Sequence, residues 1–365
     1  MKTITQLKRR NLLGKKVLVR VDFNVPIEAG KVADGFRIEQ SWPTIEYLLK
    51  NGARVILVSH LGDDGKKSLA PVAKYLGKFV GVKLVKKFDN LEPATPRAHL
   101  RSGWWGEGGQ VVLLENIRQH DGEKKNDPEF AKRLAGLADI YVNDAFSVSH
   151  RVHASVVGVT KYLPSYAGLL FVKEFKNLSL ALKPKKPFIV ILGGLKFQTK
   201  IPLIKKFLKT ADQIFIGGAL ANSFFKAQGQ DVGNSIADSD VSYIKPFLKN
   251  KKIILPADVI RNKKNQIVDI GPGSLKQIAE LTKSAKLILW NGPMGWFEIG
   301  DRSGTLEVAK IIAKAKGSSI VGGGDTLAAI EELKSMDKFD FVSTAGGAML
   351  DFLATGTLPG IKALK

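Results

Sequence analysis

The sequence predicts an α/β protein with two doubly wound, Rossmann-like three-layer domains, each built on a parallel sheet and joined by a hinge helix. Three observations predict this fold. Short β-branched runs alternate with helical periodicities along the chain, the pattern of a parallel sheet covered by helices. Polar or glycine-rich residues directly follow strand after strand. The 365 residues exceed one ordinary core and indicate about two domains.

The elements of the first half follow in the order of a doubly wound domain. Runs of β-branched and other apolar residues predict strands, and apolar residues repeating at helical spacing predict the helices between them. The expected strands are residues 16–22, 54–59, 82–85, 110–115 and 139–143, and the expected helices are 38–50, 69–79 and 128–137.

A long helix at 168–182, ending before Pro184-Lys185-Lys186-Pro187, is expected to connect the domains and act as a hinge. We therefore place an N-terminal domain at 1–165 and a C-terminal domain at 166–351. The alternation then resumes. Strands are expected at 188–192, 213–216, 252–255, 286–290, 318–321 and 339–343, and helices at 199–210, 274–285, 305–314 and 327–333.

The composition excludes several classes of protein. Hydrophobic residues make up 44% of the chain and charged residues 25%, and no apolar run approaches the roughly 20 residues that a membrane span needs. The start, Met1-Lys2-Thr3-Ile4, lacks the apolar region of a signal peptide. Cysteine is absent, which excludes disulfides, thiolate catalysis and cysteine-type zinc sites. We expect a cytoplasmic protein without a membrane partner.

The charge balance favours anionic ligands. The 56 Lys and Arg residues against 34 Asp and Glu residues give a formal net charge of +22, which also raises the hypothesis of nucleic-acid binding. The lysines are scattered, however, and no aromatic residues interleave with them as a stacking platform requires. We expect a solvated surface and no specific nucleic-acid partner; a nucleic-acid-binding protein would instead show strongly salt-dependent retention on DNA or RNA.

Polar side chains follow the strands of the first half where each strand ends. The carboxyl ends of parallel strands meet at one edge of a sheet, so these side chains are expected to converge there. Guanidinium groups match carboxylate and phosphate oxygens, and the set therefore describes a pocket for a small, multiply anionic molecule. Its members are Asp22, Asn24, Arg37, His60, Arg118, Asp144, His150 and Arg151. The alternative is that the arginines are surface residues and Asp22-Phe23-Asn24 is a turn. His150-x-x-His153 suggests a metal, but no third ligand accompanies it, which favours structural or substrate-contacting histidines.

Glycines follow the strands of the second half in the same way. Exposed backbone at successive strand ends suits a flat base and a polyphosphate, and Lys196 and Lys200 are one helical turn apart. The glycine-rich segments are 193–194, 217–218, 291–293, 322–326 and 344–347. In the fourth, a strand turns into a helix, where backbone N–H groups bind phosphate and Asp325 is placed to hold a nucleotide-bound Mg²⁺. The alternative is a tight turn with an Asp-Thr helix cap. Neither a P-loop nor a Gly-x-Gly-x-x-Gly motif after the first strand is present.

Seven ordered segments resemble phosphoglycerate kinase. The resemblance runs from about residue 4 to the end and keeps the family's motif order. It rests on VRVDFNVP (19–26), SHLG (59–62), LLENIR (113–118), VNDAF (142–146), WNGP (290–293), GGGDT (322–326) and LPG (358–360). It implies reversible transfer of the acyl phosphate of 1,3-bisphosphoglycerate to MgADP, giving 3-phosphoglycerate and ATP, as a step of glycolysis. The alternative is a catalytically weakened nucleotide-binding protein on the same fold.

The resemblance also implies roles for individual residues. The glycerate ligand would bind Asp22, Asn24, Arg37, His60, Arg118 and Arg151. The nucleotide would bind Gly194, Lys196, Lys200, Gly218, Asn291, Gly292, Pro293, Glu298, Gly323, Gly324, Asp325 and Thr326, with Glu298 at the ribose and Asp325 at magnesium. Arg37 and Lys196 are expected to be catalytic, because phosphoryl transfer needs positioning and neutralised charge. A hinge motion is expected to bring the ligands together, residues from about 352 to 365 are expected to pack back on the N-terminal domain, and we expect a monomer.

Four positions depart from the family pattern: Asp63, where Arg usually follows His-Leu-Gly; Thr199, where Asp is usual; Trp296, where small or aliphatic residues are usual; and Ala345, where Gly is usual. They are expected to weaken binding or alter nucleotide preference. For Asp63 two arrangements are open. Its carboxylate repels the substrate from the site of the usual arginine, or it faces solvent while Lys66 or Lys67 enters the pocket.

Overall fold

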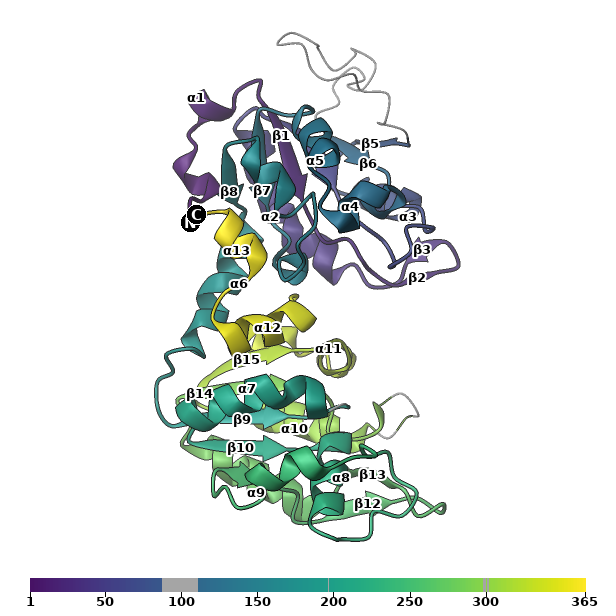
Figure 1. Cartoon of the computed structure of the whole chain (residues 1–365), viewed down its shortest axis with the longest axis vertical. Coiled ribbons are helices and arrows are strands. Elements are labelled where there is room, and N and C mark those ends of the chain that lie inside the picture. The colour runs from purple at the N-terminus through teal and green to yellow at the C-terminus, as the bar shows by residue number, and fades with distance from the viewer. Residues whose placement is uncertain (87–110, 196, 298–299, 301) are drawn as a thin grey trace. The chain divides into compact units, whose positions relative to one another are not determined.

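Each half of the chain folds around its own six-stranded sheet, in which all the strands are parallel. The computed structural model describes residues 1–86, 111–195, 197–297, 300 and 302–365 (Figure 1). The chain divides into two compact units: unit 1 comprises Met1–Phe175 with Thr357–Lys365, and unit 2 comprises Lys176–Gly356. The sequence placed these divisions at 165/166 and 351/352.

The sheet of unit 1 has the strand order β5-β6-β4-β1-β7-β8. Its central strands are buried on both faces, which explains their continuous apolar sequence. The strands are β1 (Lys16–Arg20), β4 (Arg54–Val58), β5 (Val82–Val85), β6 (Val111–Leu114), β7 (Ile140–Asn143) and β8 (Ser165–Ala167). A short hairpin joins β2 (Ile27–Glu28) to β3 (Lys31–Val32).

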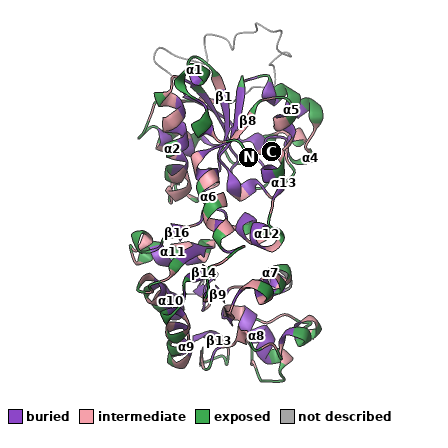
Figure 2. Ribbon diagram, turned by 90° about the vertical axis from the view of Figure 1, so that its left-hand side faces the viewer, coloured by how far each residue is buried: buried purple, intermediate pink, exposed green. Residues whose placement is uncertain are grey.

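Helices cover both faces of this sheet (Figure 2). They are α1 (Arg9–Leu12), α2 (Phe36–Lys50), α3 (Ala70–Leu76), α4 (Asp121–Lys125), α5 (Pro128–Ala135), the first part of α6 (Leu169–Leu180) and α13 (Pro359–Ala363). The start of α5 shows why a helix begins there: Pro128 occupies the first turn and the Asp127 side chain accepts a hydrogen bond from the Phe130 N–H at 2.7 Å. In α13, Gly360 N–H donates to the Ser149 carbonyl at 2.8 Å, so the end of the chain packs on unit 1.

The sheet of unit 2 has the order β11-β10-β9-β14-β15-β16. Its strands are β9 (Phe188–Leu192), β10 (Gln213–Ile216), β11 (Ile253–Ile254), β14 (Leu287–Asn291), β15 (Ser318–Gly322) and β16 (Phe341–Val342). An antiparallel hairpin pairs β12 (Val259–Arg261) with β13 (Ile267–Ile270).

The helices of unit 2 form two layers, with α9, α10 and α11 on one side of the sheet and α7, α8 and α12 on the other (Figure 2). Their buried faces meet the sheet and their exposed faces point outward, as an amphipathic helix requires. The bounds are α7 (Phe197–Thr210), α8 (Gly218–Ala227), α9 (Pro272–Lys283), α10 (Ser303–Ala313), α11 (Gly324–Glu332) and α12 (Gly347–Thr355). No helix among the described residues has both the length and the apolar character needed to cross a membrane.

The predicted fold class is confirmed: both domains are α/β with parallel sheets. The strands expected at 252–255 and 339–343 shorten to two residues each. Helix α8 was not predicted, because it begins at the Gly217-Gly218 pair that the sequence indicated as a loop, and the β12–β13 hairpin was missed as well.

The strand order places a crevice in each unit. In both sheets the chain starts near the middle, builds strands to one side and then returns to the other side, so its direction reverses between β1 and β7 and between β9 and β14. Ligands of doubly wound proteins bind beyond the carboxyl ends of the strands at such a reversal.

Candidate functional site

Beyond the carboxyl end of β1 in unit 1, Asp22 holds an arginine from α2. Arg37 Nη1 donates to Asp22 Oδ2 at 2.8 Å and to the Asn24 carbonyl at 3.2 Å, and Ser147 Oγ donates to the same Asp22 oxygen at 2.5 Å. Asn24 Oδ1 accepts from the Gly62 N–H at 2.9 Å, which ties the ends of β1 and β4 together. Burial by itself raises the pKa of Asp22. The attraction of the Arg37 guanidinium acts in the opposite direction, and the pKa is lowered to about 2. Asp22 is therefore ionised and keeps Arg37 in place.

The ring of His60 is oriented by a buried arginine. Arg20, which is 1% exposed, lies with Nη2 3.3 Å from His60 Nδ1. A guanidinium can only donate, so Nδ1 accepts and the ring proton belongs on Nε2. Burial lowers the pKa of His60 to about 3, outweighing the attraction of Asp22. His60 is thus a neutral N–H donor, suited to an anionic oxygen.

Arg20 is itself held by a buried polar chain that begins on α4. Its Nε donates to Ser155 Oγ at 2.8 Å, and Ser155 Oγ donates to Glu123 Oε1 at 2.7 Å. The Glu123 side chain is fully buried and also accepts from the Ser155 N–H at 2.9 Å. A satisfied network of this kind fixes its members in one arrangement. Arg20, Ser155 and Glu123 were not predicted as site residues; the arginine inside the VRVDFNVP strand was the only local signal.

Arg118 is paired with the departure at position 63. Its side chain is 7% exposed, and Nη1 donates to Asp63 Oδ1 at 2.6 Å and to the Gly62 carbonyl at 2.8 Å. The Asp63 side chain is 98% exposed, and Lys124 Nζ contacts the backbone carbonyl of Asp63. The Asp63 carboxylate therefore faces solvent, as in the second arrangement considered from the sequence, but Lys66 and Lys67 are also exposed. Asp63 pairs instead with Arg118, a contact that neither arrangement included.

The remaining candidates of unit 1 lie apart from this network or serve the fold. Arg151 is exposed, and among the described residues its side chain makes no hydrogen bond with the network. Asp144 is fully buried beside the start of α6. His153 Nδ1 lies 3.7 Å from Glu123 Oε1. Within the described part of the chain, no group of three or more His, Cys, Asp or Glu side chains is arranged to hold a metal.

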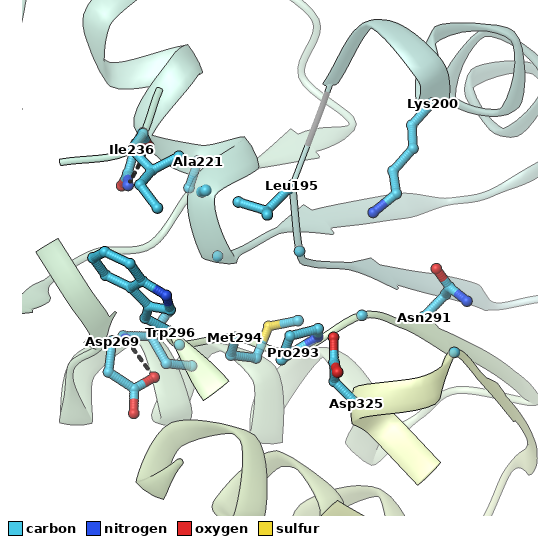
Figure 3. A pocket seen from close by; sticks show the side chains of 18 of the residues that line it. Leu195, Lys200, Ala221, Ile236, Asp269, Asn291, Pro293, Met294, Trp296 and Asp325 are labelled. Carbon is cyan, nitrogen blue, oxygen red and sulfur yellow. Dashed lines mark hydrogen bonds between the residues drawn. The ribbon is translucent and has the colours of Figure 1, made fainter. Parts of the chain in front are cut away.

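A pocket of about 340 Å³ lies at the strand reversal of unit 2 (Figure 3). Its wall includes nine of the nucleotide candidates: Gly194, Lys200, Gly218, Asn291, Gly292, Pro293, Gly323, Gly324 and Asp325. Thr326 supports it from behind, because its Oγ1 accepts from the Gly292 N–H at 2.9 Å. Lys196 and Glu298 lie outside the described residues.

Close backbone approach forms the floor of the pocket. Gly193 N–H donates to the Asn291 carbonyl at 2.9 Å and Gly194 N–H to the Pro293 carbonyl at 3.0 Å, joining the ends of β9 and β14. A Cβ on Gly193 would lie 2.0 Å from the Pro293 carbonyl oxygen, so only glycine fits there. Gly323, with φ of +107°, adopts a conformation that other residues rarely reach as β15 turns into α11.

The polar end of the pocket carries opposite charges. Lys200 on α7 is buried, and its Nζ donates to the Gly193 carbonyl at 2.5 Å. Burial lowers the pKa of Lys200 to about 8, while Asp325 acts in the opposite direction. Asp325, in the first turn of α11, and Asn291 lie at this end (Figure 3). One carboxylate does not make a protein-only metal cage, but it fits a Mg²⁺ ion that is also held by substrate phosphates.

The opposite end of the pocket is apolar. Leu195 and Ile236 are 43% and 41% exposed, and the indole of Trp296 lies on this side (Figure 3). Apart from Trp296 this end was not predicted, because Ile236 reaches it from a loop that is distant along the chain; an isoleucine within a polar loop was the available signal. Ala345 is buried and leaves the wall to Gly346 and Gly347.

Comparison with known proteins extends these observations over the whole chain. A family model described as Phosphoglycerate kinase matches residues 7–356. The phosphoglycerate kinase of Moorella thermoacetica is 43% identical, covering 98% of this chain and 98% of that protein. That of Dictyoglomus turgidum is 44% identical, covering 100% and 99%.

Solved structures agree with this match. The structure of phosphoglycerate kinase from Coxiella burnetii has a TM-score of 0.81 and 39% identity, covering 97% of each chain. That from Pyrococcus horikoshii has a TM-score of 0.83 at 29% identity, covering 100% of this chain and 98% of the other.

Proposed function

The chain belongs to the phosphoglycerate kinase family, and on that premise we propose how its residues carry the family's reaction. The activity is the reversible transfer of a phosphoryl group between 1,3-bisphosphoglycerate and ADP, giving 3-phosphoglycerate and ATP in glycolysis. The bond between phosphorus and the acyl oxygen breaks, a β-phosphate oxygen of ADP forms the new bond, and the carboxylate leaves. Because the match covers nearly the whole chain, a weakened nucleotide-binding protein is not favoured.

We assign the two substrates to different units, because the two strand-end sites differ in chemistry. In unit 1, the Nε2–H of His60 and the guanidinium groups of Arg37 and Arg118 suit the acid and phosphate oxygens of the glycerate ligand. Asp22 and Asn24 position Arg37 and the neighbouring loop. Arg151, which is exposed, is proposed to contact the ligand when it binds.

In unit 2, the glycine-rich floor and Lys200 are proposed to hold the nucleotide phosphates. The first N–H groups of α11 and the Lys200 ammonium suit phosphate oxygens. Asp325 would hold a nucleotide-bound Mg²⁺, which supplies charge neutralisation during phosphoryl transfer. Lys196 and Glu298 keep their proposed roles at the transferring phosphoryl group and the ribose. We further propose a cytoplasmic enzyme, because glycolysis uses free small-molecule substrates, and we propose that it is a monomer.

The kinase assignment is tested by ATP formation from 1,3-bisphosphoglycerate and ADP with the purified protein. Arg37→Ala is expected to lower kcat at least about a hundredfold, since losing one preorganised donor costs about 2.7–4 kcal/mol in the transition state, and to leave MgADP affinity nearly unchanged. Arg10→Ala, which removes an exposed arginine of the same unit, is the control and is expected to behave like the parent. Near-parental turnover of Arg37→Ala would remove this residue from the mechanism.

The magnesium assignment has a readout that does not depend on turnover. Asp325→Ala is expected to weaken binding of MgADP more than binding of metal-free ADP, measured by titration calorimetry. The exposed Asp337→Ala variant controls for the loss of one negative charge from unit 2. Equal losses with and without magnesium would refute the ligand role of Asp325.

A further inference from the structure

The unit 2 pocket has two ends that differ in chemistry. Lys200, Asn291 and Asp325 lie at one end, and Leu195, Ile236 and Trp296 lie toward the other (Figure 3). Among the described residues of the wall, Trp296 is the single aromatic side chain. The phosphates of a nucleotide suit the charged end, so its base faces the apolar end.

Trp296 is held by backbone contacts that aim it into the pocket. The backbone N–H of Trp296 donates to the Val268 carbonyl of β13 at 2.7 Å. Two residues earlier, the backbone N–H of Met294 donates to Thr305 Oγ1 at 2.9 Å. The indole is half-buried and lies across from Ile236 and Ala221 (Figure 3). The exposed Leu195 and Ile236 line the same pocket, so this end offers apolar surface to a ligand.

Most hydrogen-bonding atoms of the polar side chains described at this end are already used within the protein. Asp269 Oδ2 accepts from the Gly304 N–H at 2.7 Å and from Ser303 Oγ at 3.0 Å, and its Oδ1 accepts from the Ile270 N–H at 2.9 Å. Asn222 Nδ2 donates to the Ile236 carbonyl at 3.0 Å, and Asn222 Oδ1 is buried in the wall. Both Asp269 oxygens are thus occupied, and Asn222 Oδ1, which has no hydrogen-bond partner, is buried behind the surface of the wall, whereas the indole presents a flat face.

We propose that Trp296 determines nucleotide selectivity by stacking on the base, so that the enzyme selects by ring area and not by base-edge hydrogen bonds. This proposal rests on the nucleotide role of unit 2 given above. Stacking on an aromatic side chain tolerates any base and strengthens with the size of the ring. ADP and GDP are therefore both good substrates, and CDP, with its single ring, is a poorer one.

Steady-state kinetics with three nucleotides test the proposal. Trp296→Val raises the KM for ADP and for GDP about tenfold, which is about 1.4 kcal/mol and lies within the ~1–3 kcal/mol of a base–aromatic stack. It changes the KM for CDP less than about threefold, and Trp296→Phe stays within about threefold of the parent for all three. The kcat and the KM for 1,3-bisphosphoglycerate change little, which shows that the variants fold. Inhibition by tripolyphosphate, which has no base, is the same in parent and variants.

A binding experiment gives a second readout without turnover. ADP and GDP quench the tryptophan fluorescence of the parent, and tripolyphosphate does not. The quenching is lost in Trp296→Phe and kept in Trp42→Phe, a matched control in unit 1 whose ring stacks on Phe79 with centroids 5.0 Å apart.

Three results would overturn the proposal: quenching that persists in Trp296→Phe, an unchanged KM for ADP in Trp296→Val, or a parental KM for GDP more than about thirtyfold above that for ADP. The last would indicate that a polar atom reads the base edge, the candidate being Asn222 Oδ1, which is buried and has no hydrogen-bond partner in this structure. Failure of the stacking proposal is distinguishable from failure of the proposed kinase function. If only the stacking role of Trp296 is wrong, the parent still forms ATP; if the kinase function is wrong, the parent forms no ATP, whatever the fluorescence shows.

Discussion

Asp63 is the residue whose pairing bears most directly on the proposed glycerate site. It occupies one Nη of Arg118, a donor that the proposed ligand also needs, so ligand and carboxylate compete for the same group. Exposed ion pairs contribute about 0–1 kcal/mol, so the competition is modest. The expected consequence is a weakened but functional site for the acid substrate.

Removing that carboxylate should tighten binding. Asp63→Ala is expected to lower the KM for 3-phosphoglycerate roughly threefold, corresponding to about 0.6 kcal/mol, and to leave the KM for ATP unchanged. Asp64→Ala is the matched control, because this neighbouring exposed carboxylate accepts from Lys66 N–H and not from Arg118. An unchanged KM in Asp63→Ala would mean that Arg118 binds the ligand through its other nitrogens or not at all.

Lys200 should make nucleotide affinity depend on pH. Its pKa of about 8 in the free protein means that the ammonium is largely present at neutral pH and is lost as the pH rises through that value. Only the charged form attracts phosphate, so ADP affinity is expected to fall from about pH 7 to pH 9, with proton uptake on binding near pH 8.

Two substitutions test this at the same position. Lys200→Arg keeps the positive charge from pH 7 to pH 9, and Lys200→Gln removes it. The ADP affinity of both variants is expected to change little with pH, and Lys200→Gln is expected to bind ADP more weakly than Lys200→Arg. Titration calorimetry in buffers of different ionisation enthalpy measures both affinity and proton uptake. The same pH slope in the parent and in Lys200→Arg would exclude Lys200 as its source.

At the scale of elements, the start of α6 depends on a buried carboxyl group. Asp144 Oδ1 accepts from Thr44 Oγ1 at 2.8 Å and from the N–H groups of Leu170 and Phe171 at 3.0 and 3.3 Å. Burial raises the pKa of Asp144 to about 8, against the effect of these hydrogen bonds, so the group is mainly protonated at neutral pH. One oxygen thus organises the first turn of the helix and its contact with α2.

Substitution at Asp144 should separate hydrogen bonding from protonation. Asp144→Asn keeps an acceptor for the three donors, whereas Asp144→Ala leaves them buried without it and should lower the free energy of unfolding by about 1–3 kcal/mol. The folded pKa exceeds the unfolded value of 3.8, so the stability due to the bound proton is complete below the unfolded pKa and is lost as the pH rises to the folded pKa of about 8.

Asn carries no such proton. Relative to the parent, the stability of Asp144→Asn should therefore increase from about pH 4 to pH 8 and remain constant above it. Urea unfolding of parent and variant at several pH values measures this difference. A difference that does not change with pH would show that Asp144 is ionised in the folded protein.

The elements themselves were predicted unequally well. Strands β9 and β10 begin and end where their apolar runs do, because a strand buried on both faces needs an uninterrupted apolar sequence. Helix α8 escaped prediction because Gly218, with φ of +59°, stands at its start. Strand β16 is shorter than its apolar run because only Phe341 and Val342 pair with β15.

At the scale of the whole molecule, the assignment of one substrate to each unit predicts where ligands protect the backbone. MgADP is expected to slow amide hydrogen exchange at the residues that follow β9, β14 and β15, and 3-phosphoglycerate at those that follow β1, β4 and β6. A ligand at a hundred times its Kd stabilises the folded state that binds it by about 2.7 kcal/mol, which is enough to measure.

Hydrogen exchange with mass spectrometry on the full chain, with each ligand alone, provides this test. Inorganic phosphate at matched ionic strength controls for unspecific anion binding, which the +22 charge would promote. Protection of unit 1 by MgADP, or of unit 2 by 3-phosphoglycerate, would contradict the assignment.

The sequence by itself determined the α/β class, the order of most strands and helices, and the strand-end positions of the candidate site residues. It could do so because these features are local: burial on both faces requires continuous apolar runs, and a ligand-binding turn requires glycine or a polar group directly after a strand. Asp22, His60 and Asp325 were found in this way, since each follows its strand within a few residues.

Only the tertiary structure decided which of these residues meet. The pairing of Asp63 with Arg118, the orientation of His60 by Arg20, and the wall shared by Ile236 and Trp296 join residues far apart in the chain. Strand order and loop paths create these contacts, and periodicity, which reports only whether a residue is buried, does not specify its partner. The contacts around the candidate site residues were therefore what sequence patterns left undetermined.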